Sequence, residues 1–139
     1  MVRRDVARTR VTRAAAWLTD AEGLFGSDAE SFEAATKDRD LAIFYPFLAL
    51  QECIDLAAHW VADAGWGAPD DAGSAFDELA SRAAISRGVA DRMRAGVGLR
   101  NRIAHGYALL DYGRVRSEAL EDIPSLKAFL ASVGREAGL

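Results

Sequence analysis

Arg100, His105 and Tyr107 lie in the stretch from Met93 to Tyr107, where the chain gathers its chemically capable side chains. A histidine titrates near neutral pH and can take the proton of a ribose 2′-hydroxyl group, after which that oxygen can attack the adjacent phosphorus. An arginine can stabilise the charge that develops on the phosphoryl oxygens. These residue types are therefore compatible with cleavage of RNA without a metal ion.

The same three residues also fit a structural interpretation. Arg100 and Tyr107 could form a buried polar pair at a dimer interface, and His105 could do no more than cap a helix. Polar residues on a helix face are more often satisfied parts of the structure than catalytic groups. From the residue types alone, the structural interpretation is favoured.

Arg100 occupies an unusual position for a charged residue on its predicted helix. Met93, Val97 and Ala104 recur with Arg100 and Tyr107 at steps of three and four residues, which predicts that the guanidinium lies on the apolar face. An arginine there needs a carboxylate, a partner subunit or a phosphate group to balance its charge.

His105 is expected to point away from Arg100 on a regular helix, because it follows five residues later at about 100° per residue. Gly106 directly after it predicts a helix end, which would leave the imidazole free to turn toward Arg100 and Tyr107. Gly96 and Gly98 weaken the same helix, since glycine costs roughly 1 kcal/mol relative to alanine. They predict close approach of a crossing helix or a second subunit.

The order Arg-x4-His-x-Tyr, with Asn101 directly after the arginine, resembles the signature of the HepT-like toxins of the HEPN superfamily. Arg-x4-His alone arises often by chance, whereas the longer string with its flanking blocks is fairly specific. Pro46, inside a predicted long helix, departs from the family's usual pattern. The flanking blocks follow the family's order and approximate spacing over most of the chain: Asp38-Arg-Asp-Leu, Gln51-Glu-Cys-Ile-Asp-Leu-Ala and Glu121-Asp-Ile-Pro-Ser-Leu.

The resemblance implies the toxin of a type VII-like toxin–antitoxin system, a metal-independent endoribonuclease that needs no cofactor. Arg100 and His105 would be catalytic, with Asn101 and Arg102 in support, and two protomers would form a composite cleft. Such toxins are typically paired with a minimal nucleotidyltransferase antitoxin that transfers AMP to the motif tyrosine, here Tyr107, and so blocks the ribonuclease. The alternative is a non-catalytic helical partner that presents substrate or nucleotides to a nucleotidyltransferase.

Four other residues have side chains that could take part in chemistry, and we interpret them mainly as structural. Glu52 and Asp55 lie three residues apart on one face of a predicted helix, and we interpret them as a solvated or salt-bridged face. Their alternative role is a supporting one, in orienting Arg100. Cys53 fits a small core residue and His59 a structural one. Since no acidic cluster accompanies them, no metal site is predicted.

Charges are unevenly distributed along the chain. The net charge is −4, but six arginines against one aspartate lie between residues 82 and 102, and seven acidic residues against two basic ones lie between residues 20 and 40. Most basic residues are arginines, which suit bidentate phosphate contacts. A single cysteine fits a reducing compartment, and no apolar run suggests a signal peptide or a membrane span, so we expect a cytoplasmic protein.

Helical periodicity predicts an all-α fold, an antiparallel bundle of four or five helices forming a single domain over residues 1–139. Asp111 is expected to cap a turn before the last helix. The predicted elements are a helix from about Val2 to Gly23, a short turn near Ser31, a long helix over 38–64 kinked at Pro46, a short helix from a Ser74–Asp77 capping box to about Ala84, the motif helix capped by Ser86, and a last helix that starts at Asp122 and Pro124.

Overall fold

The computed structural model describes residues 3–139, and over that range it contains α-helices and no strand. This confirms the predicted all-α fold, while Val2, which was expected to begin the first helix, lies outside the described residues. The helices are α1 (Arg4–Glu22), α2 (Ala29–Ala34), α3 (Thr36–Asp63), α4 (Ala72–Ser81), α5 (Arg87–Gly106) and α6 (Tyr112–Glu136), with a 3-10 turn at Tyr107–Leu109 directly after α5.

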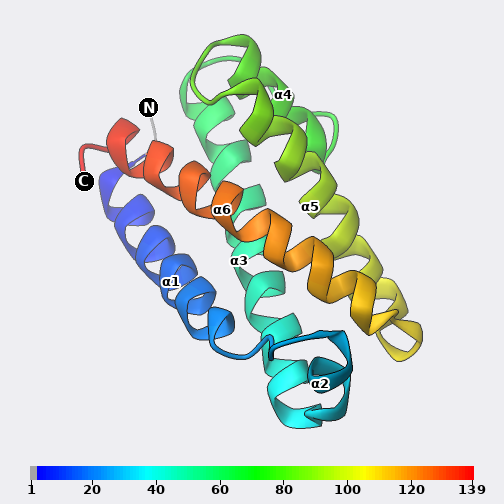
Figure 1. Cartoon of the computed structure of the whole chain (residues 1–139). Helices are drawn as coiled ribbons and strands as arrows, with labels where there is room; N and C mark the ends of the chain where they lie inside the picture. The colour runs from blue at the N-terminus through cyan, green and yellow to red at the C-terminus, as the bar shows by residue number, and fades with distance from the viewer. Residues whose placement is uncertain (1–2) are drawn as a thin grey trace.

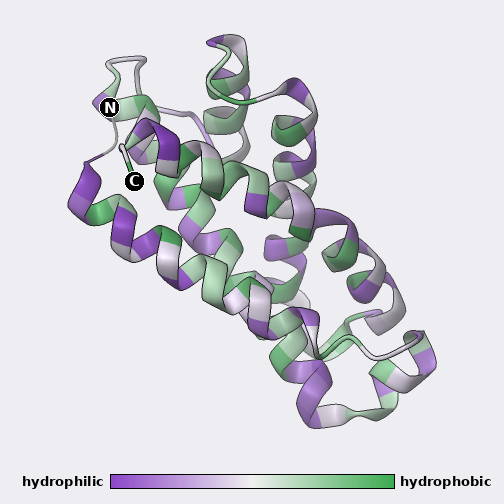
Figure 2. Ribbon diagram, turned by 60° about the vertical axis from the view of Figure 1, so that its left-hand side comes forward, coloured by the Kyte–Doolittle hydropathy of each residue, from purple (hydrophilic) through white to green (hydrophobic). Residues whose placement is uncertain are grey.

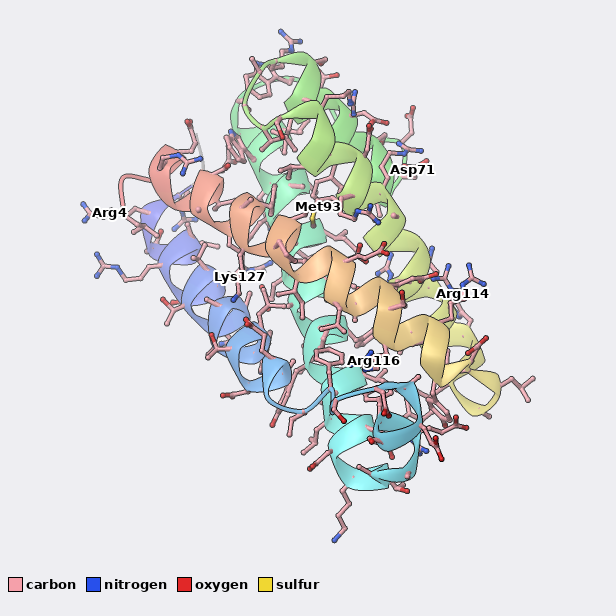
Figure 3. The ribbon with its side chains drawn as sticks, viewed as in Figure 1. Arg4, Asp71, Met93, Arg114, Arg116 and Lys127 are labelled. Carbon is pink, nitrogen blue, oxygen red and sulfur yellow. The ribbon has the colours of Figure 1, made fainter. Side chains whose placement is uncertain are left out.

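Helix α3 is the centre of the bundle, because it contacts each of the other five α-helices. Helix α5 runs beside it in the opposite direction and α1 lies on its other side, while α6 crosses in front of α3 from α5 to α1 and α2 closes one end (Figure 1). Figure 2 shows hydrophilic and hydrophobic residues alternating along the helices, as expected when each helix buries one side. Met93 of α5 is buried and points into the bundle (Figure 3).

Helix α3 is long and apolar enough to cross a membrane by length and composition, so the expectation that no segment approaches a membrane span is wrong for this helix. In the structure it packs against α1, α4, α5 and α6. Ten of its residues are buried, including Leu50, Leu56 and Trp60. The apolar composition is therefore that of a core helix.

Two prolines lie inside helices. Pro46 is buried in α3, which continues through it, and a kink there stays a prediction. Pro124 lies inside α6, so the predicted helix start at Asp122 and Pro124 is wrong. Helix α6 instead begins after Asp111, whose carboxylate accepts a hydrogen bond from the Arg114 amide at 3.1 Å. Pro124 is exposed, so the backbone carbonyl that it leaves without a donor can bind water.

Helix α4 begins one turn before the predicted capping box. The Asp71 carboxylate accepts a hydrogen bond from the Ser74 amide at 2.8 Å, and the Ser74 hydroxyl accepts one from the Asp71 amide at 3.0 Å. The box is therefore Asp71–Ser74 rather than Ser74–Asp77. The helix ends at Ser81, and Ala83 has a φ of 58° in the turn toward α5. Asp77 thus lies in mid-helix.

Candidate functional site

Two residues position α5, which carries the motif. Ser86 caps its start as predicted, because the hydroxyl accepts a hydrogen bond from the Val89 amide at 3.1 Å. Gly96 allows α5 to approach α3, since a Cβ atom added there would lie 2.8 Å from Cδ2 of Leu50. The predicted close approach of a crossing helix is confirmed at Gly96. Gly98 differs, because an added Cβ atom would meet Nη1 of Arg102 at 3.5 Å and no other helix.

Arg100 is half-buried on the side of α5 next to α3. Its Nη1 donates to Oε1 of Gln51, and its Nε donates to Oδ1 of Asn101 at 2.8 Å. These amide oxygens orient the guanidinium but do not neutralise it. Within residues 3–139 Arg100 forms no ion pair with a carboxylate, so its positive charge is available to an anion.

The prediction that Arg100 lies on the buried side of α5 is only partly correct. Val97 and Arg100 lie at the edge of the core, and Ala104 is exposed. The side that α5 buries is rotated by about one residue from the predicted one, and Gly96 on this side lies against Leu50 of α3. Its buried residues are Ala90, Met93, Gly96, Leu99 and Ile103.

His105 does not turn back toward Arg100. Helix α5 ends at Gly106, which confirms the predicted helix end, and the chain then forms the 3-10 turn. Gly106 has a φ of −133° rather than the left-handed conformation common at helix ends, and His105 stays within the last turn of α5. The expectation that the imidazole would turn toward Arg100 is therefore wrong. Since five helical residues rotate the chain by about 140° from the starting direction, Arg100 and His105 face different sides of α5.

Two separate hollows reflect this separation. Arg100 lines a hollow of about 350 Å³ between α4 and α5. His105 lines another of about 440 Å³ together with Arg102 and Leu109. Asn101 lines both, so it is the residue that links the two sides of the motif. One protomer alone does not bring the two predicted catalytic side chains together.

Tyr107 lies in the 3-10 turn with 44% of its surface exposed. Partial burial raises the pKa of its phenol, and a hydrogen bond to Asp40 raises that pKa further. Arg39 donates to Oδ1 of Asp40 through Nε at 3.0 Å, and its guanidinium lies 4.1 Å from the centre of the Tyr112 ring. Tyr107 is therefore held at a polar cluster formed by the start of α3 and the start of α6.

The predicted supporting acids lie elsewhere. Glu52 and Asp55 face α1, where Nη1 of Arg10 lies 3.6 Å from Oε2 of Glu52 and 3.3 Å from Oδ2 of Asp55. This confirms the interpretation of a salt-bridged face. It contradicts a role for these acids in orienting Arg100, because the contact with Arg100 is made by Gln51, the residue before Glu52. Their side chains point away from α5 toward α1.

Arg102 is also engaged away from Arg100. Its guanidinium pairs with Glu118 of α6, and Glu118 accepts a second hydrogen bond from Nε of Arg114 at 2.7 Å. Arg102 thus ties α5 to α6 beside the hollow that holds His105.

Residues 16–133 match the profile of the family described as ribonuclease HepT-like. The chain belongs to this family. The HepT-like match covers both the motif and the helices that position it, and a search of curated protein sequences gave no match.

Solved structures show the same fold as this HepT-like chain. A toxin–antitoxin complex with AMP-PNP contains a chain with a TM-score of 0.82 and 22% identity, and the match covers 94% of this chain and 98% of that one. A tri-AMPylated HEPN toxin of Shewanella oneidensis in complex with an MNT antitoxin gives a TM-score of 0.84 and 21% identity, with the same coverage of 94% and 98%. At these identities the likeness establishes the fold alone.

The HepT-like chain exposes apolar side chains near its motif. Leu41 and Phe44 of α3 are 41% and 50% exposed. Gln51 lies two turns after Phe44 on the same side of α3. Because α5 runs antiparallel to α3, residues before Gln51 lie alongside residues after Arg100 (Figure 1). We call the surface formed by Leu41, Phe44, Ala104 and Tyr107 the apolar face.

Metal-binding side chains do not cluster in the described part of this HepT-like chain: residues 3–139 contain no group of three or more His, Cys, Asp or Glu placed to hold a metal ion. Cys53 is buried, as predicted for a core residue, and burial raises the pKa of its thiol. His59 lies on the exposed side of α3.

The roles of Gln51 and Asp40 were not predicted from the sequence. Gln51 accepts a hydrogen bond from Arg100, and Asp40 lies close enough to Tyr107 to raise the pKa of its phenol. Both stand in the sequence blocks that flank the motif, Asp38-Arg-Asp-Leu and Gln51-Glu-Cys-Ile. Each block contains several polar residues and supplies one polar contact to a motif side chain. The polar residues of these blocks were therefore the sequence feature that could have indicated these two roles.

Proposed function

We propose that this chain is the toxin of a type VII-like toxin–antitoxin pair and acts in the cytoplasm as a metal-independent endoribonuclease without a cofactor. The observation that carries the proposal is Arg100, a half-buried guanidinium held by two amide oxygens and no carboxylate, in a member of the HepT-like ribonuclease family. A cation held in this way can bind a phosphate group directly.

The proposed reaction uses the ribose next to the scissile phosphate. His105 takes the proton of the 2′-hydroxyl group, and the 2′-oxygen forms a bond to phosphorus while the bond from phosphorus to the 5′-oxygen breaks. The departing 5′-oxygen takes up a proton from water. The products carry a 2′,3′-cyclic phosphate and a 5′-hydroxyl end. Arg100 stabilises the negative charge on the phosphoryl oxygens in the transition state.

A homodimer would complete the site. Arg100 and His105 face different sides of α5, so the reaction needs a second α5 that brings its His105 beside the first Arg100. The apolar face supports this arrangement, because exposed Phe44 and Leu41 lie along the same side of the molecule as Arg100. Burial of these side chains in a two-fold interface would stabilise the dimer.

An antitoxin of the minimal nucleotidyltransferase class would silence the enzyme at Tyr107. Two similar structures come from toxin–antitoxin complexes, one with AMP-PNP and one with an AMPylated HEPN toxin and an MNT antitoxin. The phenol of Tyr107 is exposed enough to accept AMP. The added phosphate would stand two residues from His105 and repel the RNA backbone.

Cleavage of a single-stranded RNA in the presence of EDTA tests the ribonuclease. We expect product ends with a 2′,3′-cyclic phosphate, and a loss of two to four orders of magnitude in rate for His105→Ala with an unchanged melting temperature. His59→Ala, which removes the other histidine, is the control and should cleave like wild type. A folded wild-type chain that binds a nucleotidyltransferase but leaves RNA intact would support the non-catalytic partner instead.

A further inference from the structure

The hollow of about 350 Å³ beside Arg100 is also lined by a second arginine, Arg94, and by the first turn of α4. Arg94 precedes Arg100 by six residues on α5. The proposed reaction uses Arg100 and His105 only, so it gives Arg94 no role. The position of Arg94 in the same hollow needs its own explanation.

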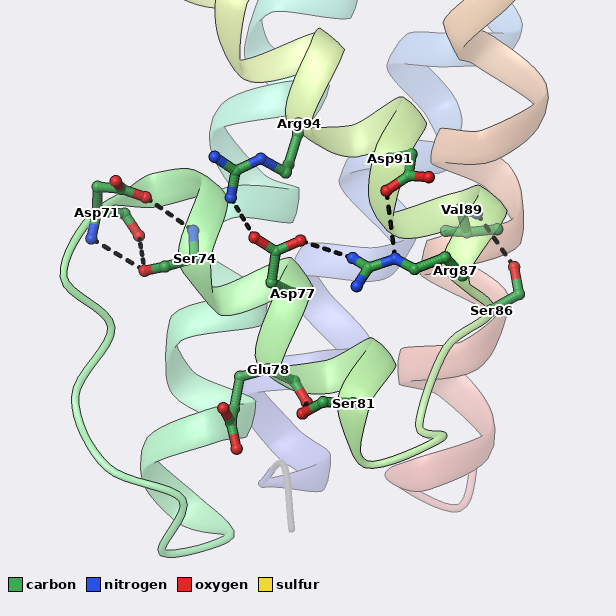
Figure 4. Close-up of polar contacts among 10 residues, drawn as sticks. All are labelled: Asp71, Ser74, Asp77, Glu78, Ser81, Ser86, Arg87, Val89, Asp91 and Arg94. Carbon is green, nitrogen blue, oxygen red and sulfur yellow. Dashed lines mark hydrogen bonds and ion pairs between the residues drawn. The ribbon is translucent and has the colours of Figure 1, made fainter.

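Asp77 of α4 forms ion pairs with two arginines, Arg94 and Arg87 (Figure 4). Nη1 of Arg94 contacts Oδ2 of Asp77, while Nη2 of Arg87 lies 2.6 Å from Oδ1 of the same carboxylate. Because Arg87 stays on Asp77, Arg94 can exchange this contact for another anion without leaving the carboxylate unpaired. Arg94 is therefore held near the hollow but is not locked to its partner.

Gly73 sets the position of the Arg94 guanidinium. A Cβ atom added at residue 73 would lie 3.1 Å from Nη1 and 3.2 Å from Cζ of Arg94. The guanidinium thus rests against the backbone of α4, in space that a side chain at residue 73 would occupy. Replacing Gly73 would displace the charge without removing it.

We propose that this hollow binds an RNA phosphate next to the scissile one, with Arg94 as its main contact. The proposal rests on the proposed ribonuclease function. A guanidinium presents a planar set of donors that matches phosphate oxygens. Because Arg94 and Arg100 line the same hollow, a strand whose scissile phosphate contacts Arg100 can place a neighbouring phosphate against Arg94. Arg94 is a binding residue, and the chemistry stays with Arg100 and His105.

Binding of a fluorescent single-stranded RNA tests this, measured in a His105→Ala background so that the RNA stays intact. Arg94→Ala should weaken binding at least tenfold and reduce the slope of log affinity against log salt by about 0.7. Arg82→Ala is the matched control, because Arg82 is 49% exposed against 46% for Arg94 and also pairs with an acid of α4. It should weaken binding less than threefold. Equal losses for the two variants would mean a general charge effect and would overturn the proposal.

Gly73→Ala provides a test that leaves the net charge unchanged. The new methyl group should displace the Arg94 guanidinium and weaken RNA binding at least threefold, while the melting temperature stays equal or rises, because alanine favours the helix. Gly88→Ala is the control, since its added Cβ atom would meet only Oγ of Ser86 at 4.0 Å. If Gly73→Ala binds RNA like Gly88→Ala, the hollow is not the phosphate site.

The triphosphate of ATP is the other source of the same chemistry, so ATP binding is measured on the same variants. If Arg94→Ala loses affinity for ATP and keeps its affinity for RNA, the RNA assignment is wrong. Wild-type cleavage with equal RNA binding by Arg94→Ala and Arg82→Ala would refute this inference alone. A wild-type chain that neither binds nor cleaves RNA would refute the proposed function as well.

Discussion

At the scale of single residues, Arg100 shows how the fold keeps a cation ready for an anion. Gln51 and Asn101 both offer it a neutral oxygen. An amide oxygen fixes the direction of the guanidinium, whereas a carboxylate would also cancel its charge. Residue 52 is a glutamate, but it faces α1, where it pairs with Arg10. The order of residues 51 and 52 therefore decides which of the two side chains meets Arg100.

Gln51→Glu would place a carboxylate against Arg100 in nearly the same volume. We expect kcat/KM for RNA cleavage to fall at least tenfold, about 1.4 kcal/mol of transition-state stabilisation, because the new ion pair competes with the phosphate. The melting temperature should not fall. Gln51→Ala is the control, since it removes the hydrogen bond without adding charge, and it should lose less activity. Equal or greater loss for Gln51→Ala would argue against charge competition.

Tyr107→Phe separates modification from catalysis. The phenylalanine keeps the ring in place but lacks the hydroxyl group that would accept AMP, so growth arrest should persist even with the nucleotidyltransferase present. Intact mass after incubation with the transferase and ATP should show no added AMP. Tyr112→Phe is the matched control from the same cluster and should still be silenced. AMP addition to the Tyr107→Phe chain would place the modification elsewhere.

Asp122 is a buried carboxylate of α6, and burial raises its pKa from 3.8 to about 6. The folded state therefore binds the proton more tightly than the unfolded state, so the free energy of unfolding should decrease as pH rises from about 4 to about 6. Asp122→Asn should abolish this decrease and add about 2 kcal/mol to the free energy of unfolding at pH 7. Urea unfolding at several pH values measures both. Exposed Glu121→Gln is the control and should keep the wild-type pH dependence.

Sequence reasoning located the motif residues but not their relative positions. Arg100, His105 and Tyr107 were predicted from residue type and order, and those are properties of the chain itself. The expectation that His105 would turn back depended on Gly106 ending the helix. Gly106 does end the helix, but His105 precedes it and keeps its helical position. A glycine can indicate where a helix ends, but it does not redirect the residue before it.

At the scale of helices, the two glycines of α5 have opposite surroundings. Gly96→Ala should lower the free energy of unfolding by about 1 kcal/mol, because the methyl group would overlap Leu50 of α3 and this outweighs the gain in helix propensity. Gly98→Ala should raise it by up to about 1 kcal/mol, since only a flexible arginine side chain lies near. Chemical unfolding of both variants measures the difference. Stabilisation by Gly96→Ala would show that the helices can separate freely.

The helices themselves were predictable from periodicity, and their ends were predictable only where one cap was available. Ser86 was identified because no competing acceptor precedes it. At α4, Asp71 and Ser74 could each begin a helix, and the earlier one did. At α6, Pro124 suggested a helix start, but a proline on the exposed side of a continuous helix is tolerated. Several residues can thus each suggest a helix end, and the actual end is the one that lets the helix bury more of its apolar side.

At the scale of the whole molecule, the separation of Arg100 and His105 matters most. Each lines its own hollow, and the two residues face different sides of α5. The apolar face beside Arg100 includes three large side chains that are 41% to 50% exposed, Leu41, Phe44 and Tyr107, which is unfavourable for a monomer. One two-fold contact would cover this surface and pair each Arg100 with the partner's imidazole.

Mixing two inactive variants tests this composite site. Arg100→Ala and His105→Ala should each be inactive alone, but a mixed dimer holds one site with both residues intact. Random exchange makes half of the dimers mixed, each with one of two sites restored, so activity should return to about a quarter of wild type. Adding Phe44→Asp to both chains should prevent this recovery by disrupting the apolar face, whereas Leu139→Asp, at a similarly exposed leucine of the C-terminus, should not. If exchange is verified by mass and activity stays absent, each chain uses its own Arg100 and His105, and the separation across α5 must close by another route.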